Sequence, residues 1–350
     1  MFSPFVVCYL FLGGTGAGAC FAMAVAGLLV PNSHIRFDPA YRKLFVPGLL
    51  AGIGALALGC VCLAFDLGRA DRLLLLLASP APTVLTVGAY ALVACLVLSV
   101  ALLLFWSSGG TWRIWVARVI GVAAVVASLA AMAYTGFLLQ GMRAVPLWAS
   151  AWLPVLFVAS SLSCGIALLL LVAFLTNTLS LFRTVFRRLV AVDVAAIAIE
   201  CVAAVLVVVA AGTLFGDVGI GQAAGAGDEM GSAAALAVGS GWPYAQPGMD
   251  MGSIAPIDSD MTQTQVAAAA SVETLLAGPD AWVFWFGFVA AGLLVPLLFE
   301  TVLFARVRRR IHVPAALPVM ISLCVLVGGF ALRFAIVNAG MHPVAMSIGW

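Results

Sequence analysis

Charge is scarce in this sequence, and that scarcity restricts the kind of protein it can be. Only 9% of the 350 residues are charged, whereas 65% are apolar and the mean hydropathy is +1.20. A soluble globular protein is about 45–50% apolar and about 25% charged. The composition therefore excludes an ordinary soluble domain and predicts an integral membrane protein. The expected partner is a lipid bilayer, and no nucleic-acid partner is expected.

Histidine and metal-binding patterns of cysteine are almost absent as well. The three histidines, His34, His312 and His342, fall in predicted connections or in the C-terminal tail, where they cannot form the axial pair that holds a haem inside a helix bundle. The eight cysteines all lie within apolar segments, without the CxxC or Cys/His spacing of a zinc site or an iron–sulfur cluster. No metal, haem or iron–sulfur cluster is therefore expected in this chain.

What the chain does have is long apolar segments. About 20 apolar residues cross the hydrocarbon core of a bilayer as a helix. Eight segments meet that length, namely 5–30, 44–65, 84–106, 114–139, 152–175, 190–215, 282–304 and 314–337. They lack the alternation of barrel strands, so the predicted fold class is an all-α integral membrane protein with eight transmembrane helices. Tryptophans near the segment ends, such as Trp106 and Trp148, are typical of interfacial belts.

Lysine and arginine are distributed unevenly between the connections. Twelve of the sixteen follow the first, third, fifth and seventh segments. Because basic residues favour the cytoplasmic side, both termini are predicted to lie outside, together with the sequence DLGRADR that contains Asp66 and Arg69.

One connection, 216–280, is much longer than the others. It is rich in Gly, Ala, Ser and Gln, carries eight acidic residues, and contains no Lys or Arg. Low hydrophobic bulk and charge of one sign make it a poor core former. We expect an extracytoplasmic insert, which is either a docking segment for an external subunit or a tolerated loop insertion.

Ionisable side chains inside the apolar segments are costly and are functional candidates by default. Glu200 lies near the predicted midplane, Asp193 lies on the same helical face nearer the inside, and Glu300 reaches a similar depth. Together with Arg333 they are candidates for a proton path from the inner face, and the alternative is neutral carboxyls hydrogen-bonded between helices. Arg333, near the outer end of the last segment, is expected to reach the surface or to pair with Asp66.

Four stretches carry a family resemblance. They are YLFLGGTGAGA in the first segment, DLGRADR after the second, YTGFLLQGMRAVPLWASAWLPVLFVASSLSCG through the fourth and fifth, and GGFALRFAIVNAG in the eighth. Together they resemble the NrfD/PsrC family, the membrane subunits of polysulfide reductases and related molybdopterin oxidoreductases. The resemblance implies a first four-helix bundle in 1–140, a second in 141–350, and a location in the cytoplasmic (inner) membrane of a prokaryote. It also implies two partners on the outer side, a four-cluster iron–sulfur subunit and a catalytic, molybdopterin-type subunit.

The same resemblance implies a quinol site at the outer face of the first bundle. Tyr134 of YTG would bond the quinone head group, and Asp66 and Arg69 of DLGR would shape the pocket and its proton exit. Gly13 and Gly14 would let the ring approach the first helix. The implied catalytic residues are Asp66 and Tyr134, and the substrate is menaquinone or a related quinone. The full implied quinone-binding set is Tyr9, Gly13, Gly14, Thr15, Asp66, Arg69 and Tyr134.

The expected function is a membrane anchor that oxidises quinol, or reduces quinone, and exchanges electrons with the iron–sulfur subunit. The terminal catalytic site would lie on another subunit, so whether this chain is itself an enzyme is left open. Two alternatives remain. One is a secondary transporter or ion pump that uses Glu200 and Arg333, and the other is a structural anchor with a degenerate pocket.

Overall fold

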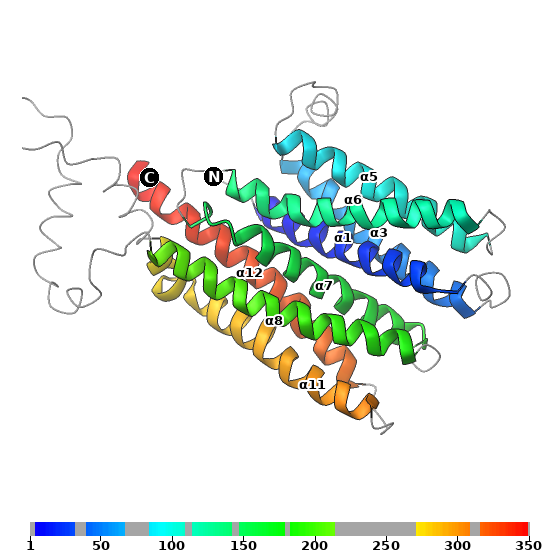
Figure 1. Ribbon diagram of the computed structural model, residues 1–350. Coiled ribbons are helices and arrows are strands. Elements are labelled where there is room, and N and C mark those ends of the chain that lie inside the picture. The colour runs from blue at the N-terminus through cyan, green and yellow to red at the C-terminus, as the bar shows by residue number, and fades with distance from the viewer. Residues whose placement is uncertain are drawn as a thin grey trace, which may run out of the picture.

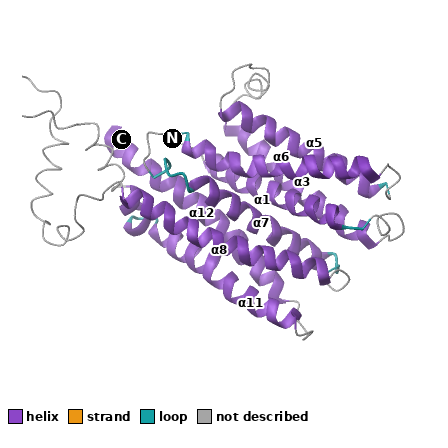
Figure 2. Ribbon diagram, in the orientation of Figure 1, coloured by secondary structure: helices purple, strands orange, loops and turns teal. Residues whose placement is uncertain are grey.

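The computed structural model describes residues 4–31, 40–66, 84–108, 114–141, 147–178, 183–213, 271–308 and 316–348. Within these ranges every regular element is a helix (Figure 2). The elements are α1 (Pro4–Leu29), α3 (Ala40–Asp66), α5 (Val84–Ser107), α6 (Ile114–Gln140), α7 (Leu153–Leu175), α8 (Arg183–Thr213), the π-helix η1 (Val283–Leu294), α11 (Val295–Arg308) and α12 (Ala316–Ile348).

Eight of the described helices, counting η1 with α11 as one, are long and apolar enough to cross a membrane. The predicted all-α, eight-span membrane fold is therefore confirmed. Some helix ends differ from the predicted segments, because α8 begins at Arg183 and α12 continues to Ile348. Hydropathy marks where apolar residues end, whereas a helix continues as long as its backbone hydrogen bonds do.

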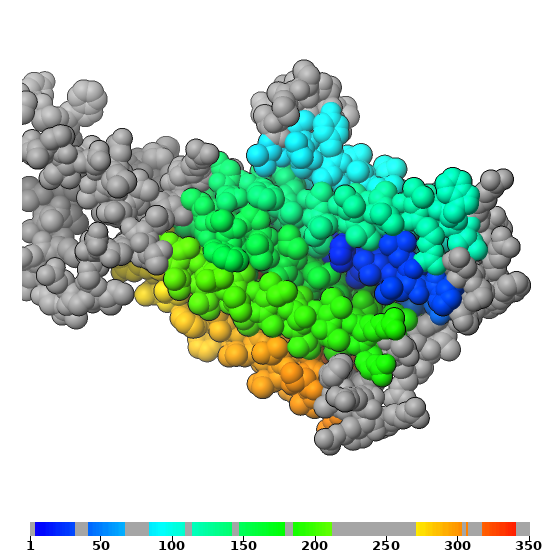
Figure 3. All heavy atoms as spheres, viewed as in Figure 1, coloured from blue at the N-terminus to red at the C-terminus, as the bar shows by residue number. Residues whose placement is uncertain are grey.

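Helices α1 and α7 contact each other in the middle of the fold (Figure 1). For reference, α1, α3, α5 and α6 are called the first set and α7, α8, η1, α11 and α12 the second, and α3 and α6 of the first set also contact α7. Helices α3, α5 and α6 contact α1, whereas α8 and α12 contact α7, and η1 and α11 contact α12. The α1 and α7 spans are the most deeply buried of the eight. Figure 3 shows α6, α7 and α8 on one face of the molecule, with part of α1 visible between α6 and α8. The division into bundles at residue 140 and the outside placement of both termini stay predictions.

Glycines let α1 approach its two neighbours closely. A Cβ atom on Gly16 would lie 2.5 Å from the backbone nitrogen of Leu56 in α3. On the opposite side, a Cβ on Gly18 would collide with the backbone of Ser161 in α7. Such small residues allow helix backbones to touch in a membrane. The glycine run of the first segment therefore holds α1 between α3 and α7.

The last part of the predicted insert belongs to the helical framework. Residues 271–277 are helical and Leu275 is buried. The Trp285 indole donates a 3.0 Å hydrogen bond to the Leu276 carbonyl, and Asn338 of α12 donates one to Asp280. The remainder of the insert lies outside the described residues.

Two tryptophans predicted to lie at the membrane interface are buried instead. Trp106 stacks on Phe45 with ring centroids 4.0 Å apart. Trp148 is 2% exposed, and its indole nitrogen donates a 2.9 Å hydrogen bond to the Ile336 carbonyl. Position near a segment end does not distinguish an indole at the lipid surface from one that joins helices. Trp115 and Trp282 are exposed, as an interfacial belt requires.

Candidate functional site

Two tyrosines from different helices face each other in the first set of helices. Tyr9 of α1 is fully buried, and Tyr134 of α6 is nearly so. Their hydroxyls are close enough to interact, although their geometry falls short of a regular hydrogen bond. Gly88 of α5 lies directly against the Tyr134 ring, where a Cβ atom would overlap three ring carbons. The position of the Tyr134 ring therefore depends on a glycine at residue 88.

A cleft of about 790 Å³ lies beside Tyr134, between α5 and α6. The polar side chains in its lining are Tyr134 and Gln140, and the remainder of the lining is apolar or glycine. Val87 and Phe137, which also line it, are exposed on the outer surface of the two helices. Ligand pockets commonly measure about 300–1,000 Å³ and combine an apolar wall with a few polar groups. The cleft suits a ligand with a polar head and an apolar tail.

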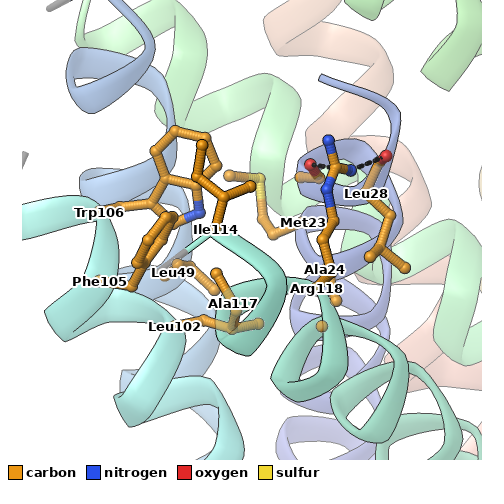
Figure 4. A pocket seen from close by; sticks show the side chains of 12 residues that line it. Met23, Ala24, Leu28, Leu49, Leu102, Phe105, Trp106, Ile114, Ala117 and Arg118 are labelled. Carbon is orange, nitrogen blue, oxygen red and sulfur yellow. Dashed lines mark hydrogen bonds between the residues drawn. The ribbon is translucent and has the colours of Figure 1, made fainter. Parts of the chain in front are cut away.

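The cavity in Figure 4 lies at the opposite end of α1 and differs in size. It measures about 20 Å³, which is room for about one water molecule. Arg118 of α6 lies at its edge and donates hydrogen bonds to the carbonyls of Gly27, at 3.3 Å, and of Leu28 and Val30 (Figure 4). A positive charge near a helix C-terminus is stabilising. Arg118 therefore fixes the C-terminal end of α1.

The glycines predicted to leave room for a quinone ring are covered in this structure by other parts of the chain. A Cβ atom on Gly59 of α3 would lie 2.8 Å from the Gly13 nitrogen, so α3 packs there. A Cβ on Gly14 would lie 2.5 Å from the Ser161 hydroxyl and 3.0 Å from Nη2 of Arg333. The space around both glycines is thus filled by helix packing.

Of the remaining predicted quinone-site residues that the structure describes, Thr15 and Asp66 do not line the cleft. Thr15 is buried, and its hydroxyl has no hydrogen-bond partner among the described residues. Asp66 is the last residue of α3 and is exposed, and it is not part of the cleft lining. Arg69 lies outside the described residues. Tyr134 is the predicted residue that lines the cleft, and Tyr9 stands behind it.

Arg333 of α12 is fully buried where α1, α7 and α12 meet. Its Nε donates to the Leu10 carbonyl at 3.1 Å. Nη1 donates to the Gly329 carbonyl at 2.7 Å and to the Ser160 hydroxyl at 3.1 Å. Nη2 donates to the Ser161 hydroxyl at 2.9 Å. The guanidinium therefore joins three helices through four hydrogen bonds.

The expectation that Arg333 reaches the outer surface or pairs with Asp66 is wrong. Position along the last segment suggested an outward orientation, but the side chain points inward between helices. The lack of side chains at Gly14 and Gly329 leaves space for it. The rings of Phe11 and Phe157 lie 5.8 and 5.4 Å from the guanidinium carbon, within the range of cation–π attraction.

The buried carboxyls of the second set form two centres. Glu200 of α8 is buried and lies near enough to Ser160 and Arg333 to interact with them. Asp193 of α8 and Glu300 of α11 are fully buried and lie against each other. Their four oxygens have no hydrogen-bond donor among the described residues. Ionised carboxylates only accept hydrogen bonds, so these two side chains can bond to each other only when one of them carries a proton.

Three serines of α7 lie at these centres, and the sequence analysis did not single them out. Ser160 and Ser161 bind Arg333, whereas Ser163 lies beside Asp193. Residues three apart share a helix face. Three serines within one apolar segment were the available signal. Gly88 and Gln140 of the cleft were also missed, because their role depends on how α5 packs on α6.

A comparison with known protein families finds a match over nearly the whole sequence. A family model described as polysulphide reductase, NrfD, matches residues 1–345. The chain belongs to the NrfD family. The family resemblance of the four sequence stretches is thereby confirmed. Among characterised relatives, the C subunit of the polysulfide reductase from Wolinella succinogenes is 29% identical over 185 residues, which is 49% of this protein and 57% of that subunit. The match thus spans somewhat more than half the length of that relative.

Proposed function

We propose that this NrfD protein is the membrane subunit of a respiratory oxidoreductase and that it oxidises quinol, or reduces quinone, in the cleft beside Tyr134. The observation that carries this proposal is a large apolar cleft between two membrane spans with a buried phenol at its wall. An isoprenoid quinone has the matching shape, a polar ring on an apolar chain. Family membership and the name of the Wolinella succinogenes relative support a place in a larger complex.

The chemistry needs one hydrogen-bonding group at each end of the reacting ring. Oxidation of a quinol gives a quinone, two protons and two electrons. A phenol both donates and accepts hydrogen bonds, so Tyr134 can bind a ring oxygen in either redox state. Tyr9 lies behind Tyr134, and Gln140 is a candidate for the second ring oxygen. Asp66 and Arg69 are proposed to pass the released protons outward.

The electrons must leave to a partner, because the proposed site holds only the substrate. We propose a four-cluster iron–sulfur subunit on the outer side as their acceptor, with a catalytic, molybdopterin-type subunit beyond it. Such a complex would lie in the cytoplasmic membrane of a prokaryote. The terminal reaction would then belong to the catalytic subunit.

The buried carboxyl centres support a second element of the proposal, proton movement through the second set of helices. Asp193 and Glu300 are proposed to share a proton, and Glu200 of α8 and Arg333 of α12 form the neighbouring buried centre. The same centres are the observation that favours the alternative, a secondary transporter or ion pump. The π-helix η1 lies in the same span as Glu300, and π-helical turns occur frequently at functional sites.

Tyr134→Phe tests the quinol site, with Tyr90→Phe of α5 as the matched control because that phenol is exposed and outside the cleft lining. We expect Tyr134→Phe to lower turnover of a short-chain quinol analogue by about 10²-fold or more, as loss of a proton-transfer group does, with the complex still assembled. If Tyr134→Phe and Tyr90→Phe turn over the analogue at the same rate, Tyr134 is not part of a quinol site. Ion flux without any quinol turnover, abolished by Glu200→Gln, would favour the transporter.

A further inference from the structure

The connection between α6 and α7 forms one end of the cleft. Gln140, the last residue of α6, lines the cleft together with Gly141 and Ala149. The other lining residues belong to α5 and α6, where the backbone hydrogen bonds of a regular helix fix their positions. Ala149 lies in a turn instead, so its position depends on the contacts that its neighbours in the chain make.

Trp148, the residue before Ala149, is anchored in the second set of helices. Its indole nitrogen donates a 2.9 Å hydrogen bond to the carbonyl of Ile336 in α12, and its side chain is buried. Gly340 lies four residues further along α12, and a Cβ atom there would overlap Cζ2 and Cε2 of the indole. Residues four apart lie on the same face of a helix. One face of α12 therefore holds the indole, through a carbonyl at Ile336 and the lack of a side chain at Gly340.

The same connection has a second fixed point where it enters α7. A Cβ atom on Gly136 of α6 would overlap the Cα atom of Pro154, so the backbones of α6 and α7 touch there. The Leu153 amide donates a 3.2 Å hydrogen bond to the Ser150 carbonyl, which closes the turn that leads into α7. Ala149 thus lies between two fixed points, the indole in α12 and the contact of α6 with α7.

We infer that Trp148 is a positioning residue for the cleft, because it fixes the wall at Ala149 by anchoring the connection to α12. One wall of a ligand site in the first set of helices is then held by a helix of the second set. Displacement of the indole moves Ala149, its neighbour in the chain, and changes the space that a quinol can occupy beside Tyr134. The identity of the ligand rests on the proposed function, whereas the anchoring of residues 147–149 does not.

Two substitutions disturb the indole independently, and each has a matched control. Trp148→Phe removes the hydrogen bond to α12 and keeps an aromatic ring, whereas Gly340→Ala places a methyl group where the indole lies. Trp285→Phe is the control for the first, because it removes a 3.0 Å hydrogen bond from an indole to a backbone carbonyl outside the cleft lining. Gly54→Ala is the control for the second, because a Cβ atom there meets nothing within 4 Å.

The first measurement is steady-state turnover of a short-chain quinol analogue by the intact complex. A displaced wall loses contacts that the quinol makes equally in the ground state and the transition state, so KM should rise while kcat stays nearly unchanged. Loss of one methyl-sized contact in an apolar pocket weakens binding by about tenfold or more. We therefore expect KM to rise about tenfold in Trp148→Phe and in Gly340→Ala, and to stay at the wild-type value in both controls. A purely structural role would lower the amount of folded complex, and with it the maximal rate, without changing KM. An unchanged KM in both variants would overturn the inference.

Amide hydrogen exchange of the purified full-length protein tests the anchoring without any quinol. A segment that loses its buried contacts opens more often and exchanges faster. We expect faster exchange at residues 147–150 in Trp148→Phe and in Gly340→Ala than in the wild type and the two controls. Exchange at the wild-type rate in both variants would overturn the anchoring, whatever the kinetics show. If the wild-type complex turns over no quinol, the proposed function fails, whereas exchange at residues 147–150 still decides whether Trp148 fixes this wall.

Discussion

Gly88→Ala should displace Tyr134 and thereby test whether the position of that ring matters. In this structure a Cβ atom at residue 88 would overlap Cε2, Cδ2 and Cζ of the Tyr134 ring. Carbon atoms in contact lie about 3.5–4.0 Å apart, so the ring or α5 must move by more than about 1 Å. Overpacking of this kind costs about 1–3 kcal/mol. Replacing glycine by alanine in a helix recovers about 0.5–1 kcal/mol, which leaves a net destabilisation.

Gly54→Ala of α3 is the matched control, because a Cβ atom at residue 54 meets nothing within 4 Å. That variant should be as stable as the wild type or slightly more so. The assay is thermal unfolding of the purified subunit together with quinol turnover of the assembled complex. A misplacement of about 1 Å can lower a rate by about 10²-fold, and we expect a loss of that order for Gly88→Ala alone. Wild-type turnover and an unchanged melting temperature in Gly88→Ala would refute the packing that places Tyr134.

Three further predictions concern single contacts outside the cleft. Trp148→Phe should destabilise the subunit by about 1 kcal/mol through loss of the Ile336 hydrogen bond, whereas Trp115→Phe on the exposed surface should have no measurable effect in the same thermal melt. Arg118→Gln should expose the end of α1, and we expect faster amide hydrogen exchange at residues 27–30 with the remainder of α1 unchanged. Asp193→Asn should keep wild-type stability because its amide can donate to Glu300 in place of the shared proton, whereas Asp193→Leu should cost about 1–3 kcal/mol by leaving a buried carboxyl unpaired.

The number and type of the helices could be predicted because each span is an apolar run of the right length, and apolar length is a local property. The existence of a close approach at α1 was also visible, since a run of glycines has few other uses inside a membrane. Helix ends were less predictable, as Arg183 and Ile348 illustrate. These residues extend helices beyond the apolar core, where hydropathy carries no information about the backbone.

The partners of buried polar residues could not be predicted. Arg333 was placed correctly in a span, but its acceptors are a carbonyl 323 residues away and two serines 172 and 173 residues away. Such contacts depend on which helices pack against each other, and a local sequence pattern does not predict which helices are neighbours. The pairing of Asp193 with Glu300 was accessible because both depths could be counted from the same membrane face. Equal depth makes contact possible, and the packing of α8 on α11 then brings the two carboxyls together.

The small-residue packing of α1 gives the two sites a physical connection. At Gly16 and Gly18 the backbone of α1 touches α3 and α7 with no side chain between them, so little flexible material can absorb a displacement. Close-packed interiors transmit strain because they have low compressibility. Tyr9, which lies behind Tyr134 of the cleft, and Leu10, whose carbonyl accepts a hydrogen bond from Arg333, are consecutive residues on this helix. A ligand that presses on one therefore acts on the other through a single rigid backbone segment, and the two sets of helices need no further contact to communicate.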